Sequence, residues 1–268
     1  MQIRKANGDL QEFSLEKVRE SVMRAGASGE LAIRLANDVQ RRMKDGMTTR
    51  EVYQLVREML KQGNVCVSCR YSLRDALAKL GPAGFQFEQY IAALLKTMGY
   101  RAWLPEEYQG AAIWHEIDVE ATKDGKHHAI EVKFRNDNRD HVRSQDVMVA
   151  HARFLDLGKK FDDVWGVTNG VFSDRATKYG TYYHVRLIGW RELAPMIDSV
   201  GLYPVTVLEG LTTAELSVLA QQGLMLCRDL AQQEIDELVE RLGFPRERLE
   251  ELVRLASEII AQPVATSA

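Results

Sequence analysis

Cysteine is scarce in this sequence, since Cys66, Cys69 and Cys227 are the three in 268 residues. So few thiols in a chain of this length exclude a scaffold held together by disulfides. Cys66 and Cys69 have the spacing of half a zinc site, but a structural zinc site needs four Cys or His ligands and no second half lies near them in the sequence. We therefore expect the cysteines to serve as small buried side chains.

Long apolar runs and an excess of basic charge are also missing. No run of about eighteen apolar residues occurs, and the N-terminus does not open with a basic stub followed by an apolar segment. We therefore expect a cytoplasmic protein with no membrane partner. The net charge of −3 gives no general affinity for nucleic acid, so any DNA contact must come from local basic clusters, such as the one at Lys133, Arg135 and Arg143.

With 46% hydrophobic and 27% charged residues, the composition fits a globular protein of two or three domains. Residues 1–80 begin with turn formers at Asn7-Gly8-Asp9, which predict a β-hairpin. Four helices follow: one capped by Ser14, one over residues 30–44, one from residue 48 or 49, and one over residues 70–80. The stretch Gly81-Pro82-Ala83-Gly84 breaks this helical pattern and predicts a domain boundary.

Residues 84–198 alternate between helical and strand patterns. Helices are expected over residues 85–98, 142–157 and 173–180, and strands over residues 101–104, 115–122, 127–134, 164–168 and 185–188. From residue 201 to 264 the strand signals fade, and helices are expected over residues 212–222, 226–242 and 245–261. The predicted fold class is α/β (α+β), with a central mixed sheet between two helical domains.

Acidic residues face each other across the predicted hairpin at Asp124-Gly125. Counting back from this turn, opposed residues have numbers that sum to about 249, so Asp118 faces Glu131. Side chains alternate along a strand, so Glu131 and Lys133 share a face while Val132 points into the core. Two adjacent carboxylates repel each other unless a cation lies between them.

Such a cluster suits Mg²⁺ or Mn²⁺, since magnesium takes one or two carboxylates together with waters and a substrate phosphate. Lys133 can then activate the attacking water and offset charge on the reacting phosphate. Glu88, on the first helix of this region, is a further candidate ligand. The alternative is an exposed cross-strand pair with a solvated lysine, because charged residues alternate on every half-exposed strand.

These residues resemble the Mrr-like restriction endonucleases of the PD-(D/E)XK nuclease superfamily. The resemblance covers about residues 84–198 and rests on Gly84-Phe85-x-Phe87-Glu88, on Asp118 with Glu131-Val132-Lys133, and on the stretch from Val167 to Ile188. It implies that Asp118, Glu131 and Lys133 are catalytic, that Glu88 assists, and that Gln145 on the following helix takes part. The family often has a tyrosine four residues after this glutamine, where this chain has Val149.

Residues 1–80 resemble the ATP-cone, a regulatory nucleotide-binding domain. The resemblance rests on Ile3-Arg4-Lys5-x-Asn7-Gly8, Phe13-x-x-x-Lys17-Val18, Thr49-x-x-Val52 and Arg70-Tyr71-x-Leu73. It implies ATP or dATP as an allosteric effector, with contacts from Arg4, Lys5, Lys17 and Thr49, and with Tyr71 and Arg74 as further candidates. Cations beside free helix N–H groups suit a triphosphate. A departure is Ala6, where the family usually has a second basic residue; the alternative is a small helical interaction domain.

The glycine turn near Gly210 and Gly223 is weakly similar to helix-hairpin-helix DNA-binding modules, and a packing or dimerisation bundle explains the same residues equally well. Taken together, the sequence predicts a metal-dependent DNA endonuclease of the restriction or phage-defence type, gated by ATP or dATP and forming a homo-oligomer. Rival hypotheses are a repair or junction-resolving nuclease on the same fold, and a nucleotide-responsive DNA-binding regulator with a vestigial site.

Overall fold

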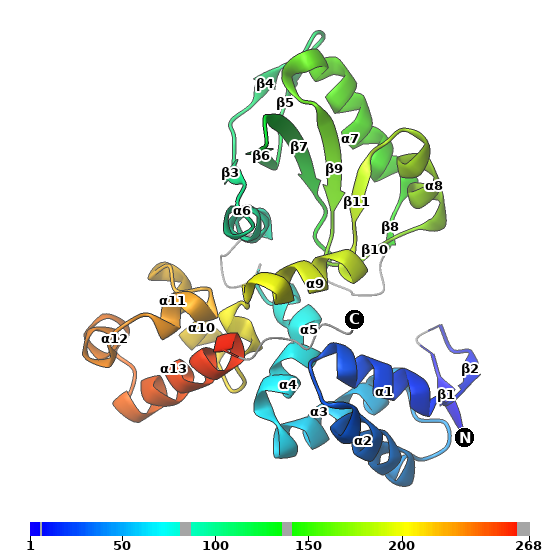
Figure 1. Cartoon of the computed structure of the whole chain (residues 1–268), viewed down its shortest axis with the longest axis vertical. Coiled ribbons are helices and arrows are strands. Elements are labelled where there is room, and N and C mark those ends of the chain that lie inside the picture. The colour runs from blue at the N-terminus through cyan, green and yellow to red at the C-terminus, as the bar shows by residue number, and fades with distance from the viewer. Residues whose placement is uncertain (6, 81–86, 136–140, 262–268) are drawn as a thin grey trace.

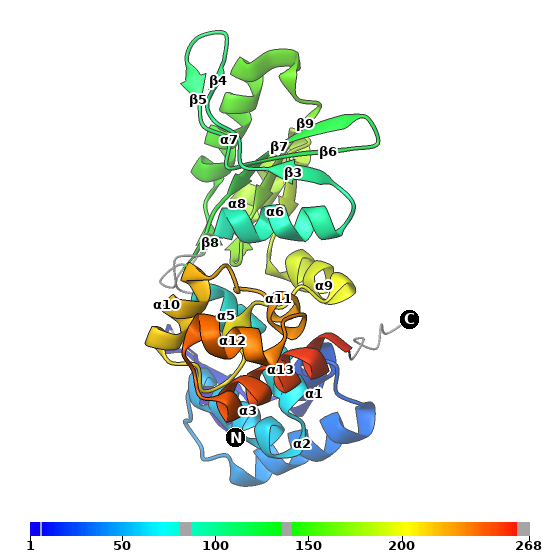
Figure 2. The same cartoon turned by 90° about the vertical axis from the view of Figure 1, so that its left-hand side faces the viewer.

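A computed structural model describes residues 1–5, 7–80, 87–135 and 141–261 of the chain. A sheet covered by helices lies at one end of the long axis, and the N-terminal and C-terminal helices lie side by side at the other (Figures 1 and 2). This mixed arrangement confirms the predicted fold class. The boundary expected at residues 81–84 falls outside the described residues, and none of the described helices is long and apolar enough to cross a membrane.

The N-terminal group opens with the predicted hairpin, in which β1 (Gln2–Arg4) pairs antiparallel with β2 (Leu10–Glu12). The Ser14 hydroxyl accepts a hydrogen bond from the Lys17 N–H at 3.3 Å and so caps the first helix, as its position predicts. The helices of this group are α1 (Leu15–Arg24), α2 (Gly29–Arg42), α3 (Thr49–Gly63), α4 (Val65–Tyr71) and α5 (Leu73–Ala78).

The single helix expected over residues 70–80 was wrong, because two helices meet at Ser72. The Ser72 hydroxyl donates to the Ser68 carbonyl at 2.7 Å, and this local bond competes with a straight helical continuation. The break also divides the packing. Helices α1 to α3 enclose a core of their own, whereas Leu73 and Leu77 of α5 belong to the large core shared with the sheet and the C-terminal helices.

The central sheet has the strand order β11-β9-β7-β6-β3. Strands β7, β9 and β11 run parallel, and β6 and β3 are antiparallel to their neighbours. Its strands are β3 (Arg101–Trp103), β6 (Val119–Lys123), β7 (Lys126–Val132), β9 (Asp163–Val167) and β11 (Arg186–Ile188). The Asp-Gly turn joins β6 to β7 with positive φ at both Asp124 and Gly125, as a two-residue hairpin requires.

Helices cover both faces of this sheet, and alternate residues of one strand reach opposite layers. Trp165 of β9 belongs to the core beneath α6 (Phe87–Thr97) and α9 (Trp190–Val200), while Val164 packs with the residues of α7 (Ser144–Leu157) and α8 (Asp174–Tyr182). Glu131 has the same parity as Ala129, which packs with Leu157 of α7. The Glu131 side chain therefore faces α7.

Two further expectations were wrong in this region. The strand over residues 115–122 is broken, because β5 (Trp114–His115) pairs with β4 (Tyr108–Gln109) and β6 starts only at Val119. His115 is drawn away from the sheet by Asp156 of α7, whose carboxylate lies 2.8 Å from the His115 Nε2. Helix α9 was not expected, because Pro195 interrupts its pattern from within. The short strands β8 (His141–Val142) and β10 (Val171–Phe172) pair in parallel beside the sheet.

The C-terminal group packs on the N-terminal group. Its helices are α10 (Thr213–Gln221), α11 (Cys227–Ala231), α12 (Ile235–Leu242) and α13 (Arg246–Ala261), preceded by the short 3₁₀ helix η3 (Val205–Val207). The continuous helix expected over residues 226–242 was wrong, since Glu234 has an extended backbone and separates α11 from α12. All three cysteines are buried free thiols, as expected from their small apolar character.

Candidate active site and nucleotide site

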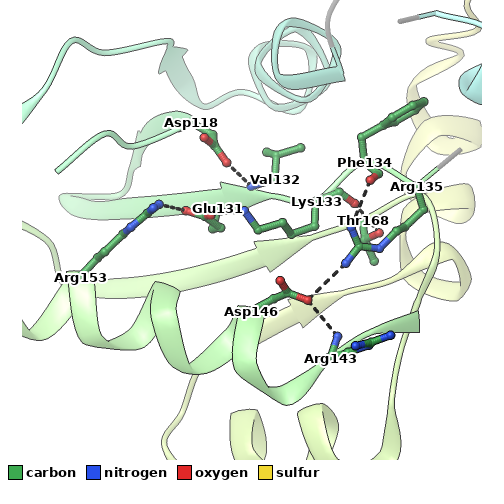
Figure 3. A network of polar contacts seen from close by, with 10 residues as sticks. All are labelled: Asp118, Glu131, Val132, Lys133, Phe134, Arg135, Arg143, Asp146, Arg153 and Thr168. Carbon is green, nitrogen blue, oxygen red and sulfur yellow. Dashed lines mark hydrogen bonds and ion pairs between the residues drawn. The ribbon is translucent and has the colours of Figure 1, made fainter. Parts of the chain in front are cut away.

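Strands β6 and β7 place Asp118 beside Glu131. Their paired residues sum to 249, as in Val119 opposite Ile130, which is the register expected from the turn. Asp118 comes directly before β6, and its Oδ2 accepts a hydrogen bond from the Val132 N–H at 2.6 Å (Figure 3). The carboxylate of Asp118 is therefore fixed against the strand that carries Glu131 and Lys133.

Glu131 is held by two cations, one on each carboxylate oxygen. Lys133 Nζ bonds Oε1, and Arg153 of α7 donates to Oε2 at 2.8 Å (Figure 3). The Glu131 side chain is 7% exposed, so both charges compensate a carboxylate that is almost out of water. Arg153 was not predicted from the sequence, because its contact with Glu131 joins a helix to a strand and leaves no local pattern.

Ionisation of Asp118 is opposed by its surroundings. Burial and the nearby Glu131 charge raise the pKa of Asp118 to about 6 from an ordinary value of 3.8, against the opposing effects of the Val132 N–H and Lys133. Glu88 also raises this pKa, so its charge is felt at Asp118. A carboxylate in such a position favours a nearby cation, because the cation relieves the repulsion.

Two of the three candidate metal ligands are thus close together, and the third lies on the wall of a cleft. This cleft of about 620 Å³ is lined by Glu88 and Asp118, by Glu106, Glu107 and Glu116, and by Leu104, Pro105, Trp114 and Ile117. Among the described residues, no group of three or more His, Cys, Asp and Glu side chains is close enough to hold a metal ion together. Asp118 and Glu131 nevertheless fit a magnesium-type ion, which commonly takes two carboxylates and completes its shell with water and phosphate.

The first turn of α7 is bonded to Arg135, which lies three residues beyond the end of β7. The Asp146 Oδ2 accepts from the Arg135 guanidinium at 3.2 Å and from the Arg143 N–H at 3.0 Å (Figure 3). Gln145 and Val149 are exposed on this helix. Among the hydrogen bonds of the described residues, none joins Gln145 to Glu131 or Lys133. Its one connection to these residues is that it lies on α7, the helix whose Arg153 bonds Glu131.

On the N-terminal hairpin, Arg4 is placed at the start of α3. The Arg4 N–H donates to the Met47 carbonyl at 2.9 Å, and Arg4 forms a bridge with Thr48, the residue that caps α3 before Thr49. Lys5 is exposed at the end of the hairpin strand, and Lys17 is exposed in the first turn of α1. Arg4 and Lys5 thus lie on the hairpin, Arg4 pairs with the cap of α3, and Lys17 lies in the first turn of α1; cations near helix N-termini suit an anionic ligand.

Tyr71 and Arg74 have different surroundings. Tyr71 is packed in the cone and stacks on Tyr53 with ring centroids 5.1 Å apart, and Tyr53 lies one turn after Thr49. Arg74 contacts the sheet domain: its Nε–H donates to the Asn169 carbonyl at 3.1 Å, and its guanidinium lies 5.6 Å from the centre of the Trp190 ring. Tyr71 therefore contacts α3, the helix that begins at Thr49, whereas the side chain of Arg74 contacts the sheet domain and not the candidate nucleotide site.

Comparison with known proteins finds a match in each of the three regions. Residues 1–79 match the ATP cone domain, residues 81–197 the Mrr-type restriction endonuclease, and residues 203–260 the C-terminal domain of AF1548-like proteins. An uncharacterized protein of Archaeoglobus fulgidus is 32% identical over 176 residues, which cover 63% of this chain and 99% of that protein.

Solved structures give the same relative. The crystal structure of AF1548, a protein of unknown function, is 32% identical, with a TM-score of 0.54 over 65% of this chain and 97% of that chain. The DNA modification-dependent restriction endonuclease AspBHI is 16% identical, with a TM-score of 0.36 over 52% of this chain and 38% of its own, a likeness too distant to support an inference.

The mixed sheet, with Asp118 directly before β6 and Glu131-Val132-Lys133 at the end of the adjacent strand β7, defines a restriction-endonuclease-like domain, and an ATP-cone precedes it. Both resemblances expected from the sequence are thereby confirmed. The chain belongs to the AF1548-like family, joined here to an N-terminal ATP-cone.

Proposed function

We propose that this protein is an Mg²⁺- or Mn²⁺-dependent DNA endonuclease of the restriction or phage-defence type, controlled by ATP or dATP bound to the cone. The observation that supports it best is the convergence of Asp118, Glu131 and Lys133 on paired strands, with Arg153 on the same carboxylate. An acid pair flanked by two cations matches the chemistry of phosphodiester hydrolysis, which needs both a metal seat and stabilisation of added negative charge.

A divalent ion held by Asp118 and Glu131 would supply a Lewis acid and lower the pKa of a bound water. Lys133 holds its proton at Nζ and can stabilise charge that develops on the phosphate oxygens. The Arg153 guanidinium presents several N–H donors in a plane and can bind a phosphate in two-point fashion. Gln145, on the same helix, lies where it can contact DNA or an ordered water.

Charge around the site gives a direction of approach for DNA. The cleft beside Asp118 is lined by five carboxylates, so its field repels a phosphodiester backbone. Arg135, Arg143 and Arg153 lie on the other side of the cluster, at and near α7 (Figure 3). We infer that the duplex approaches along α7 and reaches Asp118 from that side.

The test is cleavage of supercoiled plasmid with Mg²⁺, in the presence of ATP, dATP or no nucleotide. We expect the wild-type protein to nick or linearise the plasmid, and Asp118→Ala and Lys133→Ala to lose roughly 100-fold or more of this activity. Glu116→Ala is the matched control, since it removes an exposed carboxylate from the same cleft. Equal cleavage by wild type, Asp118→Ala and Lys133→Ala would sink the assignment of the site.

The nucleotide is proposed to act by changing how copies of the chain associate, since a double-strand cut needs two catalytic sites. Arg4, Lys5, Lys17 and Thr49 are the proposed contacts for its phosphates. Light scattering of the purified protein, with and without dATP, measures the molar mass directly. A mass that stays at one chain under both conditions would leave the nuclease intact and remove the oligomeric mechanism.

A further inference from the structure

The cone and the sheet domain meet at Arg74, a residue of α5. Its Nε–H donates to the main-chain carbonyl of Asn169 at 3.1 Å, and its guanidinium lies over the Trp190 ring. Asn169 is the second residue after β9, and Trp190 is the first residue of α9. The Arg74 side chain therefore contacts both the segment that follows β9 and the start of α9.

Asn169 in turn holds the strand that bears the candidate catalytic lysine. Its side chain is fully buried and bonds the main chain of Arg135 twice: the Arg135 N–H donates to Oδ1 at 2.7 Å, and Nδ2 donates to the Arg135 carbonyl at 2.8 Å. Beside it, the Thr168 hydroxyl donates to the Lys133 carbonyl at 2.6 Å. The backbone from Lys133 to Arg135 is therefore positioned by residues 168 and 169.

Arg135 extends this connection to the opposite wall of the site. Its guanidinium bonds Asp146 in the first turn of α7, and Arg153, two turns further along α7, bonds Glu131 (Figure 3). Displacement of the Asn169 segment would thus be felt by Lys133 through the strand and by Arg153 through the helix. Buried polar groups with all their bonds made shift as a unit, because leaving one of them unpaired is costly.

On the cone side, Arg74 lies three residues after Tyr71, which stacks on Tyr53 of α3. We propose that Arg74, Asn169 and Arg135 form a linkage that transmits nucleotide binding at the cone to the backbone of the catalytic strand. The inference rests on the proposed function and names the path of its regulation. A nucleotide shifts the active site only by the difference in its affinity for the two positions of this linkage.

The first test compares cleavage with and without ATP in the full-length protein. Wild type is expected to show a rate ratio of about fivefold or more in one direction, a typical size for coupling between two sites. Arg74→Ala is expected to bring this ratio close to one. The matched control is Arg57→Ala, which removes another contact of the cone, its ion pair with Glu209 at 3.0 Å, without touching the Asn169 segment.

The second test does not depend on cleavage. Hydrogen exchange reports on three backbone amides of this segment. The Lys133 N–H donates to the Val167 carbonyl, the Arg135 N–H to the Asn169 side chain, and the Gly170 N–H to the Thr168 hydroxyl. ATP is expected to change their exchange rates in wild type and in Arg57→Ala, and to leave them unchanged in Arg74→Ala, while calorimetry shows ATP still bound to all three.

The outcomes separate the two proposals. Absence of cleavage together with an ATP-dependent change at these amides would sink the nuclease but support the linkage. If wild type cleaves DNA but the exchange rates of these amides do not change when ATP binds, the linkage is overturned and the nuclease assignment stands. An equal loss of coupling in Arg57→Ala would also overturn it, because docking of the cone in general would then explain the effect.

Discussion

Ionisation of Asp118 costs free energy in the folded chain, because burial and the Glu131 carboxylate raise its pKa to about 6. The folded protein then holds this proton more tightly than the unfolded chain does. The contribution of Asp118 to stability therefore falls as pH rises from 3.8 to 6, and the full cost of its charge persists above pH 6. A residue that weakens the metal-free fold in this way is more easily explained by function than by stability.

We predict that Asp118→Asn stabilises the metal-free protein at pH 8 by about 1–2 kcal/mol, and by much less at pH 4.5, because the wild-type side chain is then largely protonated. The asparagine oxygen can still accept from the Val132 N–H. The same variant is expected to lose cleavage, because it removes a carboxylate proposed to hold the metal. Thermal unfolding at both pH values is the measurement, with Glu116→Gln as the control; a lower stability of Asp118→Asn at pH 8 contradicts the argument.

Arg153 competes with a metal for Glu131, since its guanidinium already bonds Oε2. We predict that Arg153→Gln binds Mn²⁺ about threefold or more tightly in the absence of DNA, because a nearby positive charge that repels the ion is removed. DNA affinity is expected to fall at the same time. Titration calorimetry measures both affinities, and Arg143→Gln, from the start of the same helix, is the control for the Mn²⁺ affinity. Unchanged Mn²⁺ affinity in Arg153→Gln would show that Glu131 is not a ligand.

Among the secondary-structure elements, the pairing of β6 with β7 could be predicted from the sequence because a local turn determines it. The Asp124-Gly125 turn fixes the register of β6 and β7, so the pairing of Asp118 with Glu131 followed from counting alone. Contacts across the fold could not be predicted in this way. Arg153 reaches Glu131 from a helix, and Arg74 reaches Asn169 over 95 residues of sequence, neither of which leaves a local pattern.

The hairpin and the start of α3 lie side by side and together form the proposed nucleotide site. We predict that Arg4→Ala weakens ATP binding by about tenfold or more, because it removes a charge-assisted bond to phosphate next to the N-terminus of α3. ATP should then raise the melting temperature of the variant less than that of wild type, since ligand-linked stability follows the ratio of concentration to Kd. Arg34→Ala removes an exposed cation from α2 and serves as the control. An equal ATP-dependent shift in Arg4→Ala and wild type would place the nucleotide elsewhere.

For the whole molecule, the boundary of the cone in sequence differs from its boundary in packing. The match to the ATP cone domain runs to residue 79, yet α5 packs in the core shared by the sheet and the C-terminal helices. Arg70 adds to this attachment, since its buried guanidinium donates to the Ile259 carbonyl of α13 at 2.9 Å. Helix α4 therefore belongs to both packing units, with Val67 in the core of α1 to α3 and Cys69 in the large core that α5 shares.

This division predicts which parts of the molecule each core residue stabilises. Leu77 of α5 is fully buried in the large core, so Leu77→Ala should cost about 2–5 kcal/mol and lower the hydrogen-exchange protection of α6, β7 and α13 together. Val22→Ala, in the separate core of α1 to α3, should reduce protection in those helices alone. If Leu77→Ala weakened only α1 to α3, α5 would move with the cone, and Arg74 would be carried by the nucleotide-binding unit itself. With the predicted result, the nucleotide signal must instead cross from one core to the other through α4, before it reaches Arg74.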